Sequence, residues 1–232
     1  MSEYILVKLD NALNYSEKQI AELEGFLSKS RQEKTTSMHP GRGRNLSILA
    51  GDALEQLLLK AGVVIPGPYG LSENGKPYLT RHPELFFSLS HSGSLVAAVL
   101  ASEPVGIDVE DLHFRGKTVE ELRRLADRFF LPEEVDFMKE ARRSEQCWGE
   151  DDLELTEDEK ESLAFYRIWT FKEAWAKAED IPLPRILKEV SYDKDNPSII
   201  QRVEKGSVLT IASPERKLRP EKVLLGGSFS LI

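Results

Sequence analysis

Cysteine is almost absent from this chain of 232 residues, which contains Cys147 and no other. A single cysteine excludes an internal disulfide and any cysteine-based zinc cluster. Long hydrophobic runs are absent too, because the longest apolar run near the middle, Leu95 to Ala101, is far shorter than the roughly 20 residues of a membrane-spanning helix. Residues 1–10 lack the basic flank and cleavage site of a signal peptide. We therefore expect a cytoplasmic protein without a membrane partner.

Basic residues are in the minority. The chain has 31 Lys and Arg against 39 Asp and Glu, which gives a formal net charge of −8. An acidic balance argues against a nucleic-acid partner. With 41% hydrophobic residues the composition is that of an ordinary globular protein, long enough for one large domain or two small ones.

One segment reverses the sign of the charge. Residues 29–44 carry five basic side chains against a single acid, Glu33. Two interpretations remain open at this point, a solvated basic loop or a set of contacts to an anionic ligand. The five basic residues are Lys29, Arg31, Lys34, Arg42 and Arg44.

Periodicity predicts groups of helices and groups of strands. Ser16 and Gln19 have the spacing of a capping box, which predicts a helix from there to about Ser30. Segregated elements favour an α+β fold over a doubly wound parallel sheet. The other expected helices are 45–61, 118–130, 132–140 and 156–179, and the expected strands are 4–9, 78–80, 86–91, 95–101, 105–111, 189–193, 198–203, 207–212 and 222–231, with a loop at 63–76 and a weakly structured acidic stretch at 145–161.

Each half of the chain offers helices followed by a group of antiparallel strands. This arrangement suggests a duplication with its seam near Pro104. The expected domains are therefore an N-terminal half, 1–104, and a C-terminal half, 105–232.

The strand expected at 105–111 places two carboxylates on one face. Asp108 and Glu110 lie two residues apart, and side chains at i and i+2 of a strand share a face. Carboxylates this close repel each other unless a cation neutralises them. Two exposed acids at a strand end are the simpler alternative, which the apolar neighbours Ile107 and Val109 weaken because they indicate burial.

A second element carries a third carboxylate. Trp169, Glu173 and Lys177 are spaced by four residues, so they form one stripe of the long expected helix. A plain Glu173–Lys177 pair on a helix of core residues explains this stripe equally well. If Glu173 instead joins Asp108 and Glu110, the three provide oxygen ligands, which favour Mg²⁺ or Ca²⁺ over zinc.

Positive charge for a phosphate ligand is also available. The basic segment at 29–44 and the lysines Lys76, Lys172 and Lys177 provide it. A magnesium ion held by carboxylates, with positions left for a phosphate, is typical of phosphoryl-transfer enzymes.

Ser90 and His91 form an adjacent serine and histidine pair. A nucleophile elbow needs glycine on both sides of its serine, and here Leu89 and His91 flank it. Neighbours along a strand also point to opposite faces, so the two side chains do not form a catalytic dyad. We expect phosphate contacts from both, with a structural histidine at a strand end as the alternative.

Four short motifs follow one another along the chain: Gly75-Lys76-Pro77, then Phe87-Ser88-Leu89-Ser90-His91-Ser92, then Gly106-Ile107-Asp108-Val109-Glu110, then Trp169-Thr170-Phe171-Lys172-Glu173-Ala174 with Lys177. Together they closely resemble the motifs of the 4′-phosphopantetheinyl transferases, specifically the long single-chain type that activates surfactin synthetase. Each motif alone is weak, whereas four in order at these separations are highly specific. The resemblance covers residues 70–180 well and the two ends only in general layout.

This resemblance implies a pseudo-twofold fold of two similar halves, each a small antiparallel sheet packed with helices, with coenzyme A in the cleft between them. The N-terminal half would take the adenine and the 3′-phosphate, and the C-terminal half the diphosphate and Mg²⁺. By the same resemblance the Mg²⁺ ligands are Asp108, Glu110 and Glu173. The adenine end is lined by Lys76 and Pro77, and the 3′-phosphate is contacted by Ser90 and His91. Lys177 holds the diphosphate with help from Lys172, and the candidates for further phosphate contacts are Arg31, Lys34 and Arg44.

The reaction of the family transfers 4′-phosphopantetheine from coenzyme A to a serine hydroxyl of an apo acyl or peptidyl carrier protein and releases 3′,5′-ADP. Glu173 is expected to deprotonate that serine, directly or through a water. The resemblance leaves the carrier open among fatty-acid, polyketide and nonribosomal-peptide carriers, and it favours a monomer.

Two other functions remain open. A Mg²⁺-dependent phosphodiesterase or nucleotide hydrolase would use the same carboxylates with water as acceptor, and a non-enzymatic coenzyme A-binding module would transfer nothing. The chain also departs from the family after Lys177, where residues 178–184 contain no glycine. This leaves the shape of the loop beside the pantetheine arm open. The acidic 145–161 stretch is expected to face away from the carrier.

Overall fold

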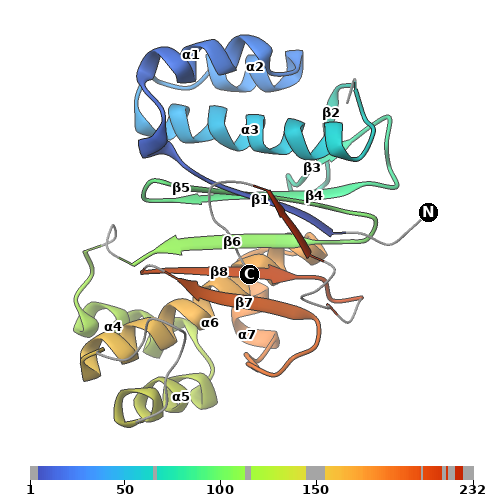
Figure 1. The fold of residues 1–232 in the computed structure, drawn as a ribbon. Helices are drawn as coiled ribbons and strands as arrows, with labels where there is room; N and C mark the ends of the chain where they lie inside the picture. The colour runs from blue at the N-terminus through green and yellow to red at the C-terminus, as the bar shows by residue number, and fades with distance from the viewer. Residues whose placement is uncertain are drawn as a thin grey trace.

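Two small β-sheets pack against each other between outer layers of helices (Figure 1). The computed structural model describes residues 5–64, 67–112, 116–144, 155–204, 206–215, 218 and 223–226. The first sheet has the strand order β4-β5-β1-β9, the second has the order β6-β8-β7, and β2 pairs with β3 as a separate ribbon. The strands are β1 (Ile5–Asn11), β2 (Tyr69–Leu71), β3 (Pro77–Leu79), β4 (Phe86–Ser92), β5 (Leu95–Ala101), β6 (Gly106–Asp111), β7 (Ile199–Glu204), β8 (Ser207–Ala212) and β9 (Val223–Gly226).

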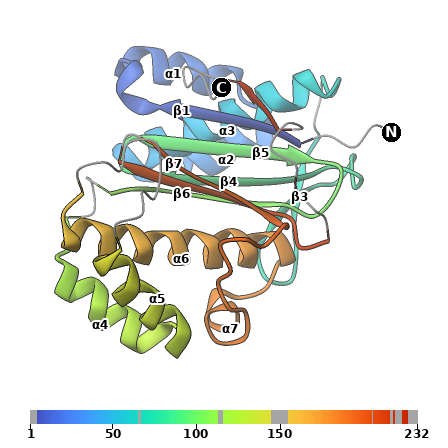
Figure 2. The ribbon, with the colours of Figure 1, turned by 60° about the horizontal axis from the view of Figure 1, so that its bottom comes forward.

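The helices cover the outer sides of the two sheets (Figure 2). α3 packs on the first sheet, with α1 and α2 against it, and α6 packs on the second sheet, with α4, α5 and α7 around it. A single 3₁₀ turn, η1 (Ala12–Asn14), follows β1. The helices are α1 (Glu17–Phe26), α2 (Lys29–Thr36), α3 (Arg42–Lys60), α4 (Val119–Phe129), α5 (Pro132–Arg143), α6 (Glu157–Glu179) and α7 (Leu183–Glu189).

Period-two alternation of apolar side chains builds the core between the sheets. Val99 on β5 and Val7 on β1 pack against Ile107, Val109 and Ile211 of the second sheet, all of them buried. The even-numbered residues of β5 point the other way, toward α3. Because β5 is buried on both faces, it reads as a continuous apolar run in the sequence.

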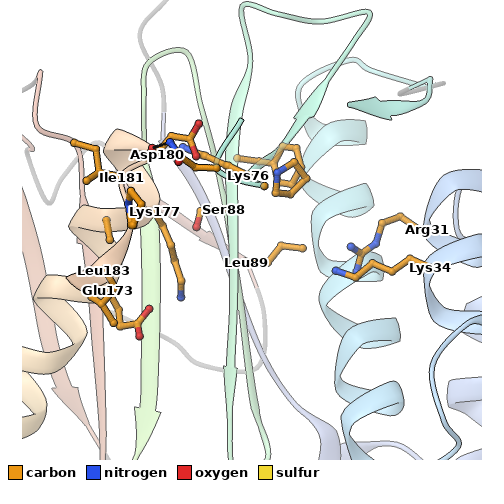
Figure 3. A pocket seen from close by; sticks show the side chains of 16 residues that line it. Arg31, Lys34, Lys76, Ser88, Leu89, Glu173, Lys177, Asp180, Ile181 and Leu183 are labelled. Carbon is orange, nitrogen blue, oxygen red and sulfur yellow. Dashed lines mark hydrogen bonds between the residues drawn. The ribbon is translucent and has the colours of Figure 1, made fainter. Parts of the chain in front are cut away.

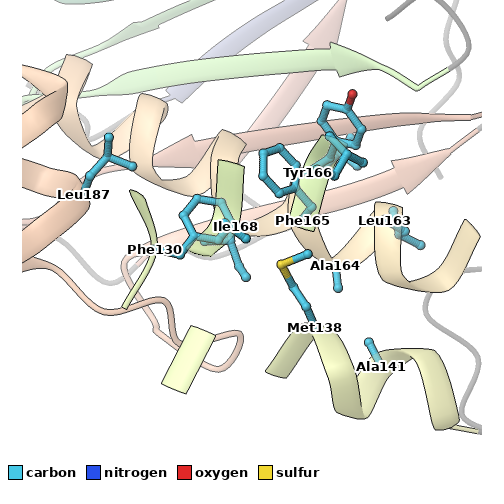
Figure 4. Packing of buried hydrophobic residues seen from close by; sticks show 12 residues of the cluster. Phe130, Met138, Ala141, Leu163, Ala164, Phe165, Tyr166, Ile168 and Leu187 are labelled. Carbon is cyan, nitrogen blue, oxygen red and sulfur yellow. The ribbon is translucent and has the colours of Figure 1, made fainter. Parts of the chain in front are cut away.

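α6 is covered on its remaining side by α4 and α5 (Figure 4). Phe130 stacks on Phe165 with ring centroids 5.0 Å apart, and Met138 fills the space between α5 and α6. The C-terminal sheet and α6 are therefore parts of one packed unit rather than a sheet with a loosely attached helix.

The α+β prediction is confirmed, and most of the expected elements lie where the sequence places them. The Ser16–Gln19 capping box is formed, and the two-residue turn Gly93-Ser94 joins β4 to β5 as a hairpin. β9 pairs parallel to β1, so a segment of the expected C-terminal half completes the sheet of the N-terminal half. The division at Pro104 remains a prediction.

The helix expected from Ser16 to Ser30 is wrong in its extent. The chain leaves α1 at Leu27, which is extended and buried, and starts α2 at Lys29. The backbone amide of Ser28 donates to the Glu55 carboxylate of α3 at 2.6 Å, so a tertiary contact ends the first helix. The solvated basic loop is wrong as well, because most of residues 29–44 are helical and Arg31 is buried.

Two further predictions need correction, and two others fall partly outside the described residues. No strand forms at 189–193, where α7 ends and its last carbonyls bind a buried lysine. The expected loop at 63–76 contains β2, and β9 accounts for 223–226 of the strand expected at 222–231, the rest of which lies outside the described residues. Most of the acidic 145–161 stretch, with Cys147, also lies outside them, but its last residues begin α6.

Glu161 shows why the end of that stretch is not a solvated excursion. Its side chain is 3% exposed and accepts two hydrogen bonds from Arg123, at 2.7 and 2.6 Å, and one from Arg142 at 3.1 Å. These contacts, led by the bond from Arg123, lower the pKa of Glu161. Within the described residues, no helix combines the length and the apolar character that crossing a membrane requires.

Gly106 determines how closely β6 approaches α6. A Cβ atom at this position would lie 1.9 Å from the backbone oxygen of Ala174 on α6. We expect Gly106→Ala to lower the free energy of unfolding by about 3 kcal/mol, since backbone must move to relieve the overlap. Urea denaturation measures this change in the free energy of unfolding.

Gly43→Ala is the matched control. Gly43 lies in α3, and an added Cβ there meets nothing within 4 Å. Alanine should stabilise that helix by about 0.5–1 kcal/mol. A similar loss of stability in both variants would contradict the close approach of β6 and α6.

Candidate active site

The edge of β6 that faces β4 is closed by serine side chains. Ser88, Ser90 and Ser92 alternate along β4, so all three hydroxyls point the same way. Each hydroxyl oxygen accepts a hydrogen bond from a backbone amide of β6. The amides are those of Ile107, Val109 and Asp111, at 3.2, 3.3 and 3.2 Å.

The three serine hydroxyls and the β6 amides that they bind form a serine seam between β4 and β6. Asp108 and Glu110 are buried beside this seam, with exposures of 5% and 4%. Ser90 Oγ donates to Asp108 Oδ1 at 2.6 Å, and Ser92 Oγ donates to Glu110 Oε2 at 2.5 Å. Asp108 Oδ2 is buried and has no hydrogen-bond partner among the described residues. The exposed-acid alternative is therefore wrong.

Lys177 joins the two parts of the site. Its ammonium lies 2.7 Å from Asp108 Oδ1 and also donates to the Ile107 carbonyl at 3.2 Å and to Ser90 Oγ at 3.4 Å. The lysine lies in the last turn of α6, and Gly106 lets that helix come close to β6. The ion pair formed by Lys177 thus runs between elements, to Asp108.

A cavity opens beside Lys177, and Figure 3 shows the side chains that line its first part. Two adjoining hollows, of about 450 and 400 Å³, share part of their lining. Arg31 and Lys34 line both hollows from α2, while Glu173 and Lys177 line both from α6. Asp108, Glu110 and Trp169 line the second hollow. Basic and acidic groups therefore meet in one cavity.

Of the two cations in the basic wall, Arg31 is poorly hydrated and Lys34 is exposed. Arg31 is buried, and its Nη2 donates to the Ser47 carbonyl at 2.8 Å, but its Nε has no partner among the described residues. Desolvation lowers the pKa of Arg31, and desolvation followed by repulsion from Arg31 lowers the pKa of Lys34. Partly desolvated cations of this kind gain from an anionic ligand.

The turn before β3 fastens onto the end of α6. Lys76 Nζ donates to the Ala178 carbonyl at 3.1 Å, and Asn74 Nδ2 donates to the Asp180 carbonyl at 2.7 Å. Asp180 ends α6 in the left-handed conformation, at φ 56°. An aspartate therefore takes the conformation that glycine usually supplies at a helix end. Lys76 and Pro77 line the first hollow, and their assignment to the adenine end of coenzyme A stays a prediction.

His91 lies on the opposite face of β4 from the serine side chains and is exposed, although it lines the second hollow. Desolvation lowers its pKa below the ordinary value of 6.5, and the charges of Lys177 and Lys34 lower it further. Ser90, in contrast, already uses its proton on Asp108 and accepts from Val109 and Lys177. In this arrangement His91 is the better candidate for a phosphate contact.

Two predicted site residues do not reach the cavity. Lys172 is fully buried on another side of α6, 2.7 Å from Glu134 of α5, and it also donates to the carbonyl of Val190. Arg44 is paired with Glu24 of α1 and donates to the Thr35 carbonyl. This geometry gives no support to the catalytic assignment of Lys172 or to the phosphate assignment of Arg44, and both stay predictions. Both residues hold helices together.

The donor set fits a hard divalent metal ion. Asp108, Glu110 and Glu173 offer carboxylate oxygens only, which such ions prefer, and the partnerless Asp108 Oδ2 is a buried acceptor that a cation would satisfy. Among the described residues, no three acidic, histidine or cysteine side chains are close enough to form a ready-made metal cluster. Lys177 holds the other oxygen of Asp108. The ligand assignment remains a prediction.

Sequence reasoning missed the role of Ser92 and the contacts of Asn74. The alternation Ser88, Ser90, Ser92 was visible as a period-two polar face on an otherwise buried strand. A row of small hydroxyls on a buried face is a signal for hydrogen bonds across a strand edge.

Several known proteins have similar sequences. A family profile described as the 4′-phosphopantetheinyl transferase superfamily matches residues 104–212. The 4′-phosphopantetheinyl transferase HetI of Nostoc sp. is 30% identical over 207 residues, which are 87% of this chain and 75% of HetI. A 4′-phosphopantetheinyl transferase of Bacillus subtilis is 26% identical over 153 residues, 65% of this chain and 59% of that protein. The 4′-phosphopantetheinyl transferase AcpT of Salmonella typhimurium is 37% identical over 107 residues, 45% of each chain.

The chain belongs to the 4′-phosphopantetheinyl transferase superfamily. The similarity to HetI supports this, since it covers most of both sequences. The match spans 59% of the length of the Bacillus subtilis relative.

The Lys172–Glu134 pair gives a test of whether Lys172 stabilises the fold or takes part in catalysis. Lys172→Met leaves a buried unpaired carboxylate, so we expect a loss of about 3 kcal/mol of stability in urea denaturation. Adding Glu134→Gln removes that charge, and its one amide oxygen keeps an acceptor for either the Leu131 or the Tyr192 amide, so it should restore part of the loss. If the refolded double variant lacked transferase turnover, Lys172 would have a catalytic role after all.

Because Lys177 holds Asp108 Oδ1, we expect its ammonium to weaken the binding of a metal ion to the same carboxylate in the free protein. We expect Lys177→Met to bind Mn²⁺ about tenfold more tightly in the absence of coenzyme A, because a charge-assisted hydrogen bond contributes about 1.5–3 kcal/mol. Lys34→Met, on the opposite wall, is the control and should change the affinity little. Electron paramagnetic resonance of free Mn²⁺ measures the affinity. Equal Mn²⁺ affinities of Lys177→Met and Lys34→Met would contradict the expected effect of Lys177.

His91 provides a pH-dependent readout. A phosphate bound beside the ring would raise its pKa from the lowered value in the free protein. Binding then takes up a proton, so coenzyme A should bind more tightly as the pH falls from about 7 to 6. Histidine NMR titration with and without coenzyme A tests this, with His91→Gln for assignment. An unchanged pKa would place the phosphate elsewhere.

Proposed function

We propose that this protein transfers 4′-phosphopantetheine from coenzyme A to a serine hydroxyl of an apo carrier protein. The observation that carries the proposal is the buried Asp108 carboxylate, held by Ser90 and Lys177 on one oxygen and without a hydrogen-bond partner on the other. It lines a cavity whose other wall carries the buried cation Arg31 and the more exposed Lys34. A diphosphate ester with a divalent cation matches that distribution of charge.

Asp108, Glu110 and Glu173 are proposed to hold Mg²⁺. When bound, the ion would neutralise charge on the diphosphate of coenzyme A. Lys177 already lies beside Asp108, so its ammonium is placed to bind the diphosphate next to these carboxylates. Arg31, Lys34 and His91 supply the remaining positive charge and hydrogen-bond donors, and Lys76 with Pro77 borders the adenine end.

The transfer needs one proton acceptor and good positioning rather than a protein nucleophile. Glu173 takes the proton of the carrier serine as the serine oxygen forms a bond to the β-phosphorus of coenzyme A. The bond between that phosphorus and the oxygen that bridges to the α-phosphate breaks. The bridging oxygen leaves with 3′,5′-ADP, and phosphopantetheine remains on the serine.

The proposal also covers the arrangement of the halves. The two sheets, each with helices on its outer side, support a pseudo-twofold duplication with coenzyme A in the cleft between them. A monomer of the long surfactin-synthetase-activating type, acting on acyl or peptidyl carriers, is the proposed form.

A mass assay tests the function. The protein is incubated with coenzyme A, Mg²⁺ and a panel of apo-carriers from fatty-acid, polyketide and nonribosomal-peptide systems. We expect a mass gain equal to the phosphopantetheine arm on at least one carrier, and 3′,5′-ADP in equal amount. Release of phosphopantetheine into water without a carrier would indicate a hydrolase instead. Binding of coenzyme A with no modified carrier and no released product would indicate a binding module.

Glu173→Gln tests the proposed base. The amide keeps the size of the side chain but accepts no proton, so we expect kcat to fall by about 10²–10⁴-fold at saturating Mg²⁺. Asp180→Asn, also at the cavity and with no assigned part in the proton transfer, is the control. Near-normal turnover of Glu173→Gln at saturating Mg²⁺ would show that another group deprotonates the serine.

A further inference from the structure

The serines of β4 differ in how their hydroxyl protons are used. A hydroxyl has one proton to donate and two lone pairs to accept with. Ser88, Ser90 and Ser92 each accept an amide of β6, so a lone pair is occupied in all three. Ser90 and Ser92 donate their protons to Asp108 and Glu110, at 2.6 and 2.5 Å. Among the described residues, Ser88 donates to no carboxylate.

The pairing repeats with the period of the strands. Ser90 and Asp108 are 18 residues apart in the chain, and so are Ser92 and Glu110. Each serine is fixed by its own strand and by the hydrogen bond that its hydroxyl oxygen accepts from a β6 amide. Its hydroxyl hydrogen therefore points in a defined direction. A carboxylate that accepts a hydrogen bond from this hydroxyl is held in one rotamer.

We infer that Ser90 and Ser92 are positioning residues that orient the Asp108 and Glu110 carboxylates for the divalent cation. This inference rests on the proposed function, and it gives the serine motif a role distinct from contact with coenzyme A. Each serine takes one oxygen of its carboxylate, and in Asp108 this leaves Oδ2 without a protein donor. Hydrogen-bond partners of metal ligands hold them in the productive orientation, and their loss typically costs 10–100-fold in metal affinity.

The seam also makes the site depend on both halves of the fold. The serines belong to the first sheet, whereas the carboxylates belong to the second. The cation-binding groups are therefore oriented by a neighbouring sheet and not only by their own strand. Ser88, which makes the amide contact alone, offers a control inside the same seam.

The experiment measures Mn²⁺ affinity of the whole protein without coenzyme A, by electron paramagnetic resonance, for Ser88→Ala, Ser90→Ala and Ser92→Ala. All three variants lose an acceptor for a β6 amide, so we expect similar decreases of Tm. Only Ser90→Ala and Ser92→Ala should weaken Mn²⁺ binding, by about tenfold. Ser92→Thr keeps the hydroxyl and should restore the affinity of the Ser92 position, which a purely structural role would not require.

The outcomes separate this inference from the proposed function. Equal weakening by Ser88→Ala, or unchanged affinity in Ser90→Ala and Ser92→Ala, would overturn the positioning role while leaving the metal site intact. If Ser90→Ala does not fold, Ser92→Ala with its threonine rescue decides the question. If the unsubstituted protein binds no Mn²⁺, and Asp108→Asn changes nothing in a carrier assay, the metal site itself fails and this inference fails with it.

Discussion

The free edge of β6 is the constraint on which the site depends. An unpaired strand edge presents backbone amides that must find acceptors when they are buried. In this fold three serine hydroxyls of β4 provide the acceptors. A further backbone strand would have satisfied the same amides, but its own N–H groups would have paired with carbonyls of β6 and not with the carboxylates. Side chains at this position close the edge and also hold Asp108 and Glu110, so the stability of the seam and the geometry of the acids have the same origin.

The distribution of charge around the cavity follows from the same packing. Asp108 and Glu110 are buried because β6 lies between the first sheet and α6, and Lys177 is close because Gly106 has no side chain. Arg31 is poorly hydrated because α2 packs against α3, and the exposed Lys34 lies beside it. Asp108 and Glu110 are thus desolvated on one side of the cavity, and Arg31 on the other. A ligand that carries both a cation and phosphates relieves both sides, whereas a neutral ligand relieves neither.

Local patterns in the sequence were sufficient where a single period governs the structure. The i, i+2 relation placed Asp108 and Glu110 together, and the helical spacing placed Glu173 and Lys177 on one stripe of α6. They were insufficient where a distant partner decides. Glu55 of α3 ends the first helix early, and Glu134 of α5 draws Lys172 away from the cavity. Arg44 met Glu24 for the same reason. In each case the partner lies far along the chain, so no local pattern contains it.

The pairing of β9 with β1 has a consequence for how the chain folds. The two strands lie near opposite ends of the sequence, and they pair in parallel as neighbours in the first sheet. During synthesis the β1 edge that β9 occupies stays unpaired until Val223, the partner of Ile5, has left the ribosome. A contact of such long range is slow to form, because much of the chain must be ordered before it closes. Until then the nascent sheet has an open edge, and chaperones or other chains compete for it.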